Sequence, residues 1–208
     1  MRHFYTLTLT MLVPLLFTTT GMTAVPGADR VEEDWQIVLA IPNPDLTCPQ
    51  ISTTMIADPS APSAVFSLNY QDFPNFVPGG LQARIVRGDA TLASSVQGSA
   101  QFQTAGETIT WTQRLTLSGG TLYFKITNGQ STTWGPFGEH HSRLSVNTAS
   151  QIDNMDKYDP GLSVSNSRPS FGMNRVASMT LLQVRYYQGQ TLLATDSTAR
   201  QVAITGFN

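Results

Sequence analysis

The stretch "GETITWTQRLTLSGGTLYFKIT", residues 106–127, decides the fold class of this chain. Its apolar residues alternate with polar ones in both halves, at Ile109, Trp111, Leu115, Leu117, Leu122, Phe124 and Ile126. Such alternation puts the apolar side chains of a strand on one face. The Ser-Gly-Gly between the halves supplies a turn. The stretch therefore predicts an antiparallel hairpin with one buried face.

Short β-rich segments recur between turn signals along the rest of the chain. The predicted strands cover residues 36–41, 50–56, 65–70, 81–86, 91–96, 143–148, 178–187 and the following "TLLAT". One short turn of helix is expected in "ASQIDNMDKY", residues 149–158. This pattern predicts an all-β, antiparallel two-sheet jelly-roll (concanavalin-like) sandwich with at most one short helix. An immunoglobulin-like sandwich is the alternative, but its Cys, Trp, Cys spacing cannot occur with one cysteine.

The first residues predict the compartment. Arg2 and His3 precede an uncharged run at residues 4–20, and a small-residue end, "GMTA", closes at Ala24. We interpret residues 1–24 as a signal peptide, 25–35 as an acidic entry segment, and 36–205 as a single β-sandwich domain. No later stretch approaches the ~20 apolar residues of a spanning helix. The sequence thus predicts an exported protein, whether secreted, periplasmic or at the cell surface, without a membrane span.

Charge and cysteine content exclude other classes. The chain has 12 basic and 14 acidic residues, a net charge of −2. Binding to a nucleic-acid backbone requires a clustered basic field, so no nucleic-acid partner is expected. The single cysteine, Cys48, cannot form an internal disulfide. It is interpreted as a small buried hydrophobe, with a reactive or intermolecular thiol as the alternative.

Catalytic patterns are missing from the sequence. His140 and His141 are the histidines after the leader, and no G-x-S-x-G elbow accompanies them. A zinc site at "EHH" would lack a third His or Cys at the usual spacing. Glycoside hydrolysis needs two nearby carboxyl groups, and only Glu32 with Asp34 forms an acidic i, i+2 pair. We therefore expect that the protein is not an enzyme.

The segment "DNMDKYD" offers ligands for a metal ion. Asp153, Asn154, Asp156 and Asp159 offer side-chain oxygens there, and calcium prefers six to eight oxygen ligands. These four residues form the candidate calcium site. The alternative is an Asx-rich turn that caps a short helix.

A ligand site is predicted in "NGQSTTWGPFG", residues 128–138. Asn128-Gly129 is read as a turn, and "QSTTW" as a short returning strand before a kinked loop. Loops of this kind at the edge of a sandwich often bind ligands. The candidate ligand-binding residues are Asn128, Gln130, Thr132, Trp134 and Phe137. The alternative is that the two aromatic residues plug the open end of the sandwich as part of the core.

Several motifs read together suggest a family. They are "VEEDWQIVL", "FVPGGLQ", "GETITWTQRLTL", "NGQSTTWGPFG", "NMDKYDPGLSVSNS" and "NRVASMTLLQVRYY". Between about Val31 and Tyr187 the chain resembles an uncharacterised family of exported bacterial single-domain β-sandwich proteins. The segment "MTLLQVRYY" also resembles the last strand of concanavalin-like or laminin-G-like jelly rolls. The resemblance implies export and a single domain, and it brings no assigned activity.

These observations favour a secreted or cell-surface, non-catalytic binding domain for carbohydrate or another surface polymer. One alternative is a structural or assembly protein of the cell envelope whose sheet edges join a partner. Another is a glycan-acting enzyme.

Export should remove the leader at or near Ala24, because small residues follow the apolar run there. Mass spectrometry of the exported protein is expected to find a mature N-terminus near Val25. Recovery of the exported chain with its leader intact would contradict the prediction of a signal peptide.

Overall fold

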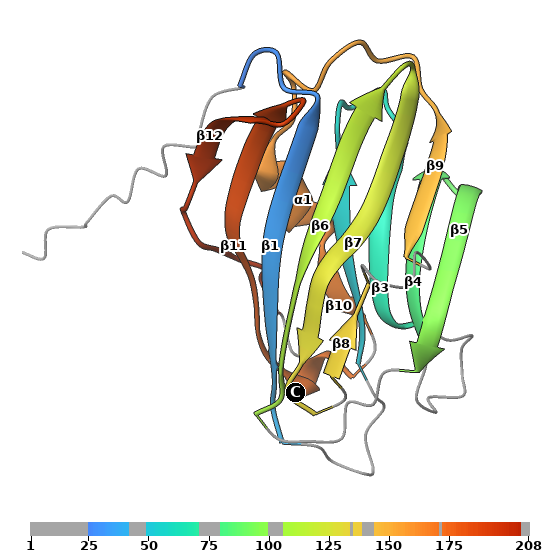
Figure 1. Ribbon diagram of the computed structural model, residues 1–208. Helices are drawn as coiled ribbons and strands as arrows, with labels where there is room; N and C mark the ends of the chain where they lie inside the picture. The colour runs from blue at the N-terminus through green and yellow to red at the C-terminus, as the bar shows by residue number, and fades with distance from the viewer. Residues whose placement is uncertain are drawn as a thin grey trace, which may run out of the picture.

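The computed structural model describes residues 25–41, 49–70, 80–99, 106–133, 135–138, 144–170 and 172–204. Two antiparallel sheets pack face to face, and the apolar core lies between them (Figure 1). The predicted all-β antiparallel sandwich is confirmed.

The large sheet has eight strands, in the order β12-β11-β1-β6-β7-β8, with β13 beside β11 and β9 beside β7. Their bounds are β1 (Arg30–Leu39), β6 (Thr108–Ser118), β7 (Thr121–Ser131), β8 (Gly135–Phe137), β9 (Ser145–Ala149), β11 (Val176–Gln188), β12 (Thr191–Asp196) and β13 (Arg200–Gln201). Within this sheet, β1 pairs with β11 on one side and with β6 on the other.

The small sheet has five strands, in the order β10-β2-β3-β4-β5. Their bounds are β2 (Gln50–Ile56), β3 (Ser63–Tyr70), β4 (Gly80–Arg87), β5 (Ala90–Ser99) and β10 (Arg168–Ser170). Helical structure in the described ranges consists of α1 (Pro160–Asn166) and one 3-10 turn, η2 (Met173–Arg175). No helix among these residues is both long and apolar enough to cross a membrane.

The predicted central hairpin is confirmed as β6 and β7. Leu115 lies opposite Phe124, and the turn glycines Gly119 and Gly120 have φ values of 54° and 70°, which favour glycine. Trp111 is buried in the core, where its ring stacks on Trp35 at 6.3 Å between centroids. The hairpin thus supplies the centre of the core.

The interpretation of residues 25–35 as an entry segment is wrong for residues 30–35, because β1 begins at Arg30. Val31 and Trp35 alternate with charged residues and are fully buried between the sheets. The acidic residues of this strand are hydrogen-bonded or ion-paired, so their charge does not keep the strand out of the sheet.

The predicted turn at Asn128-Gly129 is wrong as well. β7 runs through both residues to Ser131, and its register with β6 shifts between Thr110 and Thr112. Asn128 has a φ of 52°, so an extra residue enters one strand as a β-bulge. A side chain on Gly129 would meet the Phe137 ring at 2.4 Å, so this close approach requires glycine.

The short helix lies later in the chain than predicted. The sequence pattern favoured residues 149–158, whereas α1 covers Pro160–Asn166. Asp159 caps it by accepting a hydrogen bond from the Gly161 N–H, and proline occupies the first helical position. The alternative interpretation of "DNMDKYD" as an Asx-rich turn that caps a short helix agrees with this cap.

Trp111→Ala should lower the free energy of unfolding by about 3–5 kcal/mol, because it removes a buried ring and leaves a cavity. Tyr123 lies in the neighbouring strand but is 43% exposed, so Tyr123→Ala should change stability by no more than about 0.5 kcal/mol. Urea titration of both variants measures the difference. Similar losses would mean that the two strand faces are assigned incorrectly.

Candidate functional site

The outer face of the large sheet carries a network of charged and polar side chains. Because side chains alternate along β1, Glu32 and Asp34 point outward while Glu33 points into the core. Glu32 lies between Arg185 of β11 and Arg114 of β6. Arg114 Nε is 2.7 Å from Glu32 Oε1, and Arg185 Nη2 is 3.2 Å from Glu32 Oε2.

Asp34 is the most fully hydrogen-bonded group of this face. Arg185 donates to both of its oxygens, at 2.6 and 2.9 Å, and Thr112 and Gln183 donate at 2.7 and 2.6 Å. Burial alone raises the pKa of Asp34, but these hydrogen bonds outweigh it and hold the pKa below its ordinary value. Asp34 is therefore ionised at neutral pH and fixes Arg185 in place.

A shallow hollow of about 330 Å³ opens on this face. Its lining includes Asp34, Thr110, Asn128, Leu182 and Arg185. The bulge in β7 turns Asn128 toward β6, where its Nδ2 donates to the Thr112 hydroxyl at 3.2 Å. Bulges often re-aim a side chain in this way beside functional sites.

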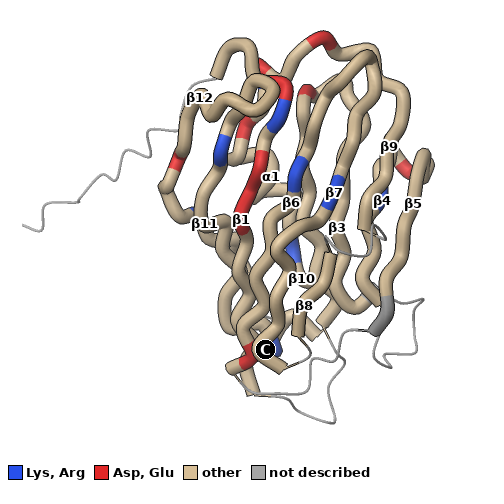
Figure 2. Tube along the Cα trace, in the orientation of Figure 1, with Lys and Arg blue, Asp and Glu red and all other residues tan. Residues whose placement is uncertain are grey.

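The outer face has an excess of positive charge. Arg30, Arg114, Lys125 and Arg185 lie on it against Glu32 and Asp34, although the whole chain has a net charge of −2. Figure 2 shows the basic residues as a band across β11, β1, β6 and β7, with acidic residues on β1. We call these six residues, with Thr112, Asn128 and Gln183, the outer-face network.

One pair in this network is electrostatically unfavourable. Arg114 and Lys125 lie directly opposite each other in the register of β6 and β7. Like charges in this position destabilise a sheet. Glu32, which lies opposite Arg114 on β1, is already shared among Arg30, Arg114 and Arg185. Within the described ranges, Lys125 has no ion-pair partner.

A second cluster of polar side chains lies inside the core around Glu33. Glu33 Oε2 accepts from Trp35 Nε1 at 2.9 Å and from Gln113 Nε2 at 2.6 Å, while Oε1 accepts from the Tyr158 hydroxyl at 2.5 Å. The cluster is extended by Thr53, which donates to Gln113 at 2.8 Å, and by Ser163, 2.9 Å from Tyr158. We call these six residues the buried carboxyl cluster.

Burial raises the pKa of Glu33, although the hydrogen bonds from Tyr158, Trp35 and Gln113 act in the opposite direction. A raised carboxyl pKa is a common mark of catalytic acids. Here, however, Glu33, Gln113 and Ser163 have no exposed surface, so a substrate could not reach them in this conformation. We interpret the cluster as a structural connection between the sheets and the segment before α1.

In the predicted ligand loop, Phe137 does not form part of an exposed aromatic platform. Phe137 is 6% exposed and stacks on Phe66 in the core. This agrees with the alternative interpretation, in which Phe137 closes the open end of the sandwich. Gln130 and Thr132 are exposed but their side chains contact their own hairpin. Among the candidate ligand residues that the structure describes, Asn128 alone joins the outer-face network. Trp134 lies outside the described residues, as do Cys48, His140 and His141.

Three of the four residues of the predicted calcium site accept hydrogen bonds from backbone N–H groups. Asp159 caps α1, Asp156 Oδ1 accepts from the Gly27 N–H at 2.8 Å, and Asn154 Oδ1 accepts from the Asp156 N–H at 3.1 Å. Where the structure is described, no three His, Cys, Asp or Glu side chains are grouped to hold a metal. The calcium prediction therefore gains no support.

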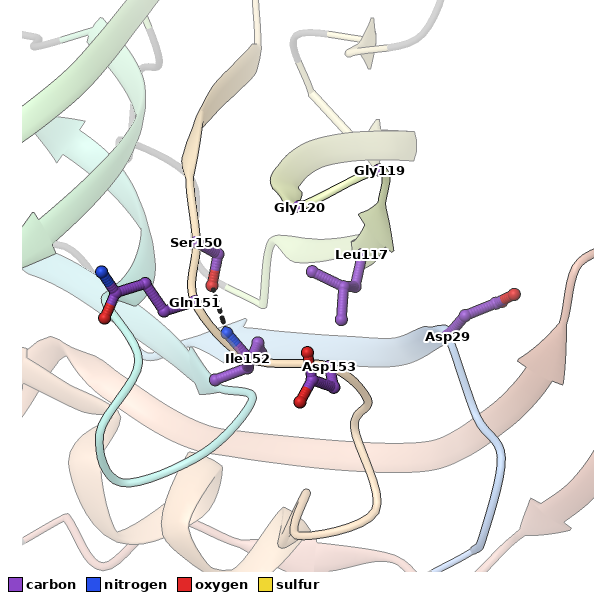
Figure 3. Close-up of a pocket in the computed structure, with 8 residues that line it drawn as sticks. All are labelled: Asp29, Leu117, Gly119, Gly120, Ser150, Gln151, Ile152 and Asp153. Atoms are coloured by element: carbon purple, nitrogen blue, oxygen red, sulfur yellow. Dashed lines mark hydrogen bonds between the residues drawn. The ribbon is translucent and has the colours of Figure 1, made fainter.

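Asp153 lines a different hollow, of about 240 Å³, together with Asp29 (Figure 3). The carboxyl of Asp29 points away from that of Asp153 in this view, and both of its oxygens accept from the Gly189 N–H at 2.9 Å. The two carboxylates are therefore not arranged as a pair.

Sequence reasoning missed the basic residues of the outer face. Arg114 and Lys125 occupy polar positions of the predicted hairpin, so their outward direction could be read from the alternation. Their neighbour Arg185 could not, because the order of strands in the sheet is needed to place β11 beside β1.

The charge of Glu33 can be tested with the isosteric variant Glu33→Gln. Since the pKa of Glu33 is raised above 4.5 in the folded state, the folded wild type retains a proton that the unfolded chain releases. The free energy of unfolding of the wild type should therefore fall as the pH rises above about 4.5, until the pH passes the folded-state pKa. The Glu33→Gln variant lacks this titrating carboxyl, so the pH dependence that it causes should be missing. The difference in free energy of unfolding between the two proteins should therefore grow with pH in that range.

Glu33→Leu is the matched disruptive variant. It leaves the donors of Trp35 and Gln113 unpaired in the core, at a cost of about 1–3 kcal/mol each. Urea titrations from pH 4 to pH 8 compare the three proteins. Parallel pH curves for the wild type and Glu33→Gln would show that burial does not raise this pKa.

No family model matches this chain, and no curated protein matches it. Among solved structures, it is similar to a crystal structure of scytalido-glutamic peptidase with a transition state analog inhibitor. The TM-score is 0.39 at 10% identity, and the match covers 85% of this chain and 84% of that chain. A structure of the same peptidase with a peptide based transition state analog has a TM-score of 0.37 at 11% identity, covering 85% and 83%.

These findings correct the predicted function. The expected non-catalytic domain for carbohydrate or another surface polymer rested on an aromatic platform, and Phe137 belongs to the core instead. The functional prediction is therefore wrong, and the outer-face network replaces the loop as the candidate site.

Proposed function

We propose that this chain is an exported protein that recognises an acidic segment of a polypeptide on the outer face of its large sheet. The observation that carries the proposal is the placement of Arg114 directly opposite Lys125. Two adjacent cations on a chain of net negative charge form a site for an anion.

The charges along this row support a carboxylate ligand. From β11 to β7 the row contains Arg185, Glu32, Arg114 and Lys125, so that positive and negative charges alternate until the last pair. A carboxylate bound between Arg114 and Lys125 would continue the alternation. Arg114 gives its Nε to Glu32, which leaves the outer nitrogens of its guanidinium group for a ligand.

The neighbouring groups favour a polypeptide over other acidic ligands. Asn128 uses one amide hydrogen on Thr112, and its second hydrogen and its carbonyl oxygen remain for a ligand. With the Thr110 hydroxyl beside it in the hollow, it presents donors and acceptors of the kind that pair with main-chain amides. Trp35 and Trp111 are buried and Arg30 covers the Tyr187 ring at 4.0 Å, so these rings are not available to stack on a sugar.

A short synthetic peptide in which Glu alternates with Ser should bind the mature protein, and the peptide with Gln in place of Glu should bind at least tenfold more weakly. Arg114→Gln and Lys125→Gln should each weaken binding about tenfold, because each removes a charge-assisted contact. Higher salt should weaken the wild-type complex as well. Isothermal titration calorimetry measures these affinities.

Arg87→Gln is the matched control, since Arg87 is exposed at the end of β4 in the other sheet. It should leave the affinity unchanged. Equal binding of the Glu and Gln peptides, or equal losses in Arg87→Gln and Arg114→Gln, would contradict recognition at this face. Mass spectrometry of the bound peptide shows in the same samples whether it is cleaved.

A further inference from the structure

We infer that β5 pairs with β5 of a second copy of this chain, antiparallel and about a two-fold axis at Ser94. This inference is independent of the ligand proposed for the outer face, because β5 belongs to the small sheet.

The first support is the position of β5 at the end of its sheet. β5 is bonded to β4 on one side, and the order of the small sheet stops there. Figure 1 shows β5 as the outermost strand on that side of the sandwich, with no described element beyond it. Alternate N–H and C=O groups of such an edge strand have no partner within the sheet and can pair with another chain.

The second support is that β5 lacks charged residues and proline, two features that often protect an edge. Its sequence, "ATLASSVQGS", contains no charged residue and no proline over ten residues. The opposite edge strand β10 has three residues and includes Pro169, and β8 of the large sheet has three residues and includes Pro136. Short length and proline both discourage strand pairing, so β5 is the long edge of the small sheet that has neither.

The third support is the spacing of exposed apolar residues on β5. Leu92 is 43% exposed and Val96 is 51% exposed, with Ser94 midway between them. In an antiparallel pair centred on Ser94, Leu92 of one copy lies opposite Val96 of the other, and the same contact occurs again across the axis. Apolar cross-strand pairs of this kind stabilise a sheet. Since β5 has no charges, the symmetry brings no like charges together.

The β4–β5 ladder is regular around the proposed axis, while Leu92 lies at a register shift beside it. Shifts in the pairing with β4 occur at the two ends of the strand, between Ile85 and Val86 and between Gly80 and Leu81. From Ala93 to Gln97 the ladder is uninterrupted. The proposed axis at Ser94 therefore falls in a regular part of the strand.

The register can be tested by a disulfide at the axis. In a Cys48→Ser background, Ser94→Cys should form a covalent dimer under mild oxidation, because opposed residues of an antiparallel pair lie about 4.5–5.5 Å apart between Cα atoms, within the range for a disulfide. Ser118→Cys, exposed at the β6–β7 turn, is the control and should stay monomeric. Non-reducing gel electrophoresis separates the two forms. Equal cross-linking of both variants would overturn the inference.

Sedimentation velocity of the unmodified protein over a range of concentrations should show a monomer–dimer equilibrium. Val96→Lys should shift it to monomer, since it brings a charge to the strand and removes an apolar contact. Leu192→Lys, on the edge strand β12, replaces an apolar residue of 50% exposure and should leave the dimer intact. Circular dichroism confirms that both variants fold. A wild type that stays monomeric, or a dimer lost in Leu192→Lys and kept in Val96→Lys, would overturn the inference.

Discussion

The hydrogen bonds of Glu33 connect the separate layers of this protein. Its carboxyl group is bound by Gln113 of β6 and by Tyr158 of the segment before α1, and Gln113 is in turn bound by Thr53 of the small sheet. Both sheets and the segment that leads into α1 thus meet at one buried group. A carboxyl in an apolar core costs free energy unless its oxygens are hydrogen-bonded. Here both oxygens have donors, and any shift of β1 along β6 would break these bonds.

The position of Glu33 in the core also determines the outer face. Because successive side chains of a strand point to opposite faces, an inward Glu33 requires that Glu32 and Asp34 point outward. Three consecutive acidic residues therefore have different environments. The pKa of Glu33 is raised by burial, whereas that of Asp34 is lowered by Arg185, Thr112 and Gln183. A slip of one residue would bury Glu32 and Asp34 without their arginine partners.

The sequence predicted the fold well where alternation was regular and poorly where polar groups satisfy one another. β2 was predicted with its observed bounds, and the β6–β7 hairpin was found from alternation and the glycine turn. β1 was placed too late because "EED" reads as solvated, and it is buried because donors distant in sequence meet these acids. Asn128-Gly129 has the composition of a turn, and the same left-handed conformation serves a bulge. The site depends on strand order, which a single sequence does not contain.

The distribution of charge favours association of a negatively charged ligand with one face of the sandwich. The outer face of the large sheet has an excess of positive charge, with four cations against two carboxylates in the outer-face network. A negatively charged ligand is therefore attracted toward this face before contact. The uncharged β5 lies at an edge of the small sheet, away from this positive band. A dimer formed through β5 would thus leave both positive faces open, so that one polypeptide with two acidic segments could engage both copies and bind more tightly than either segment alone.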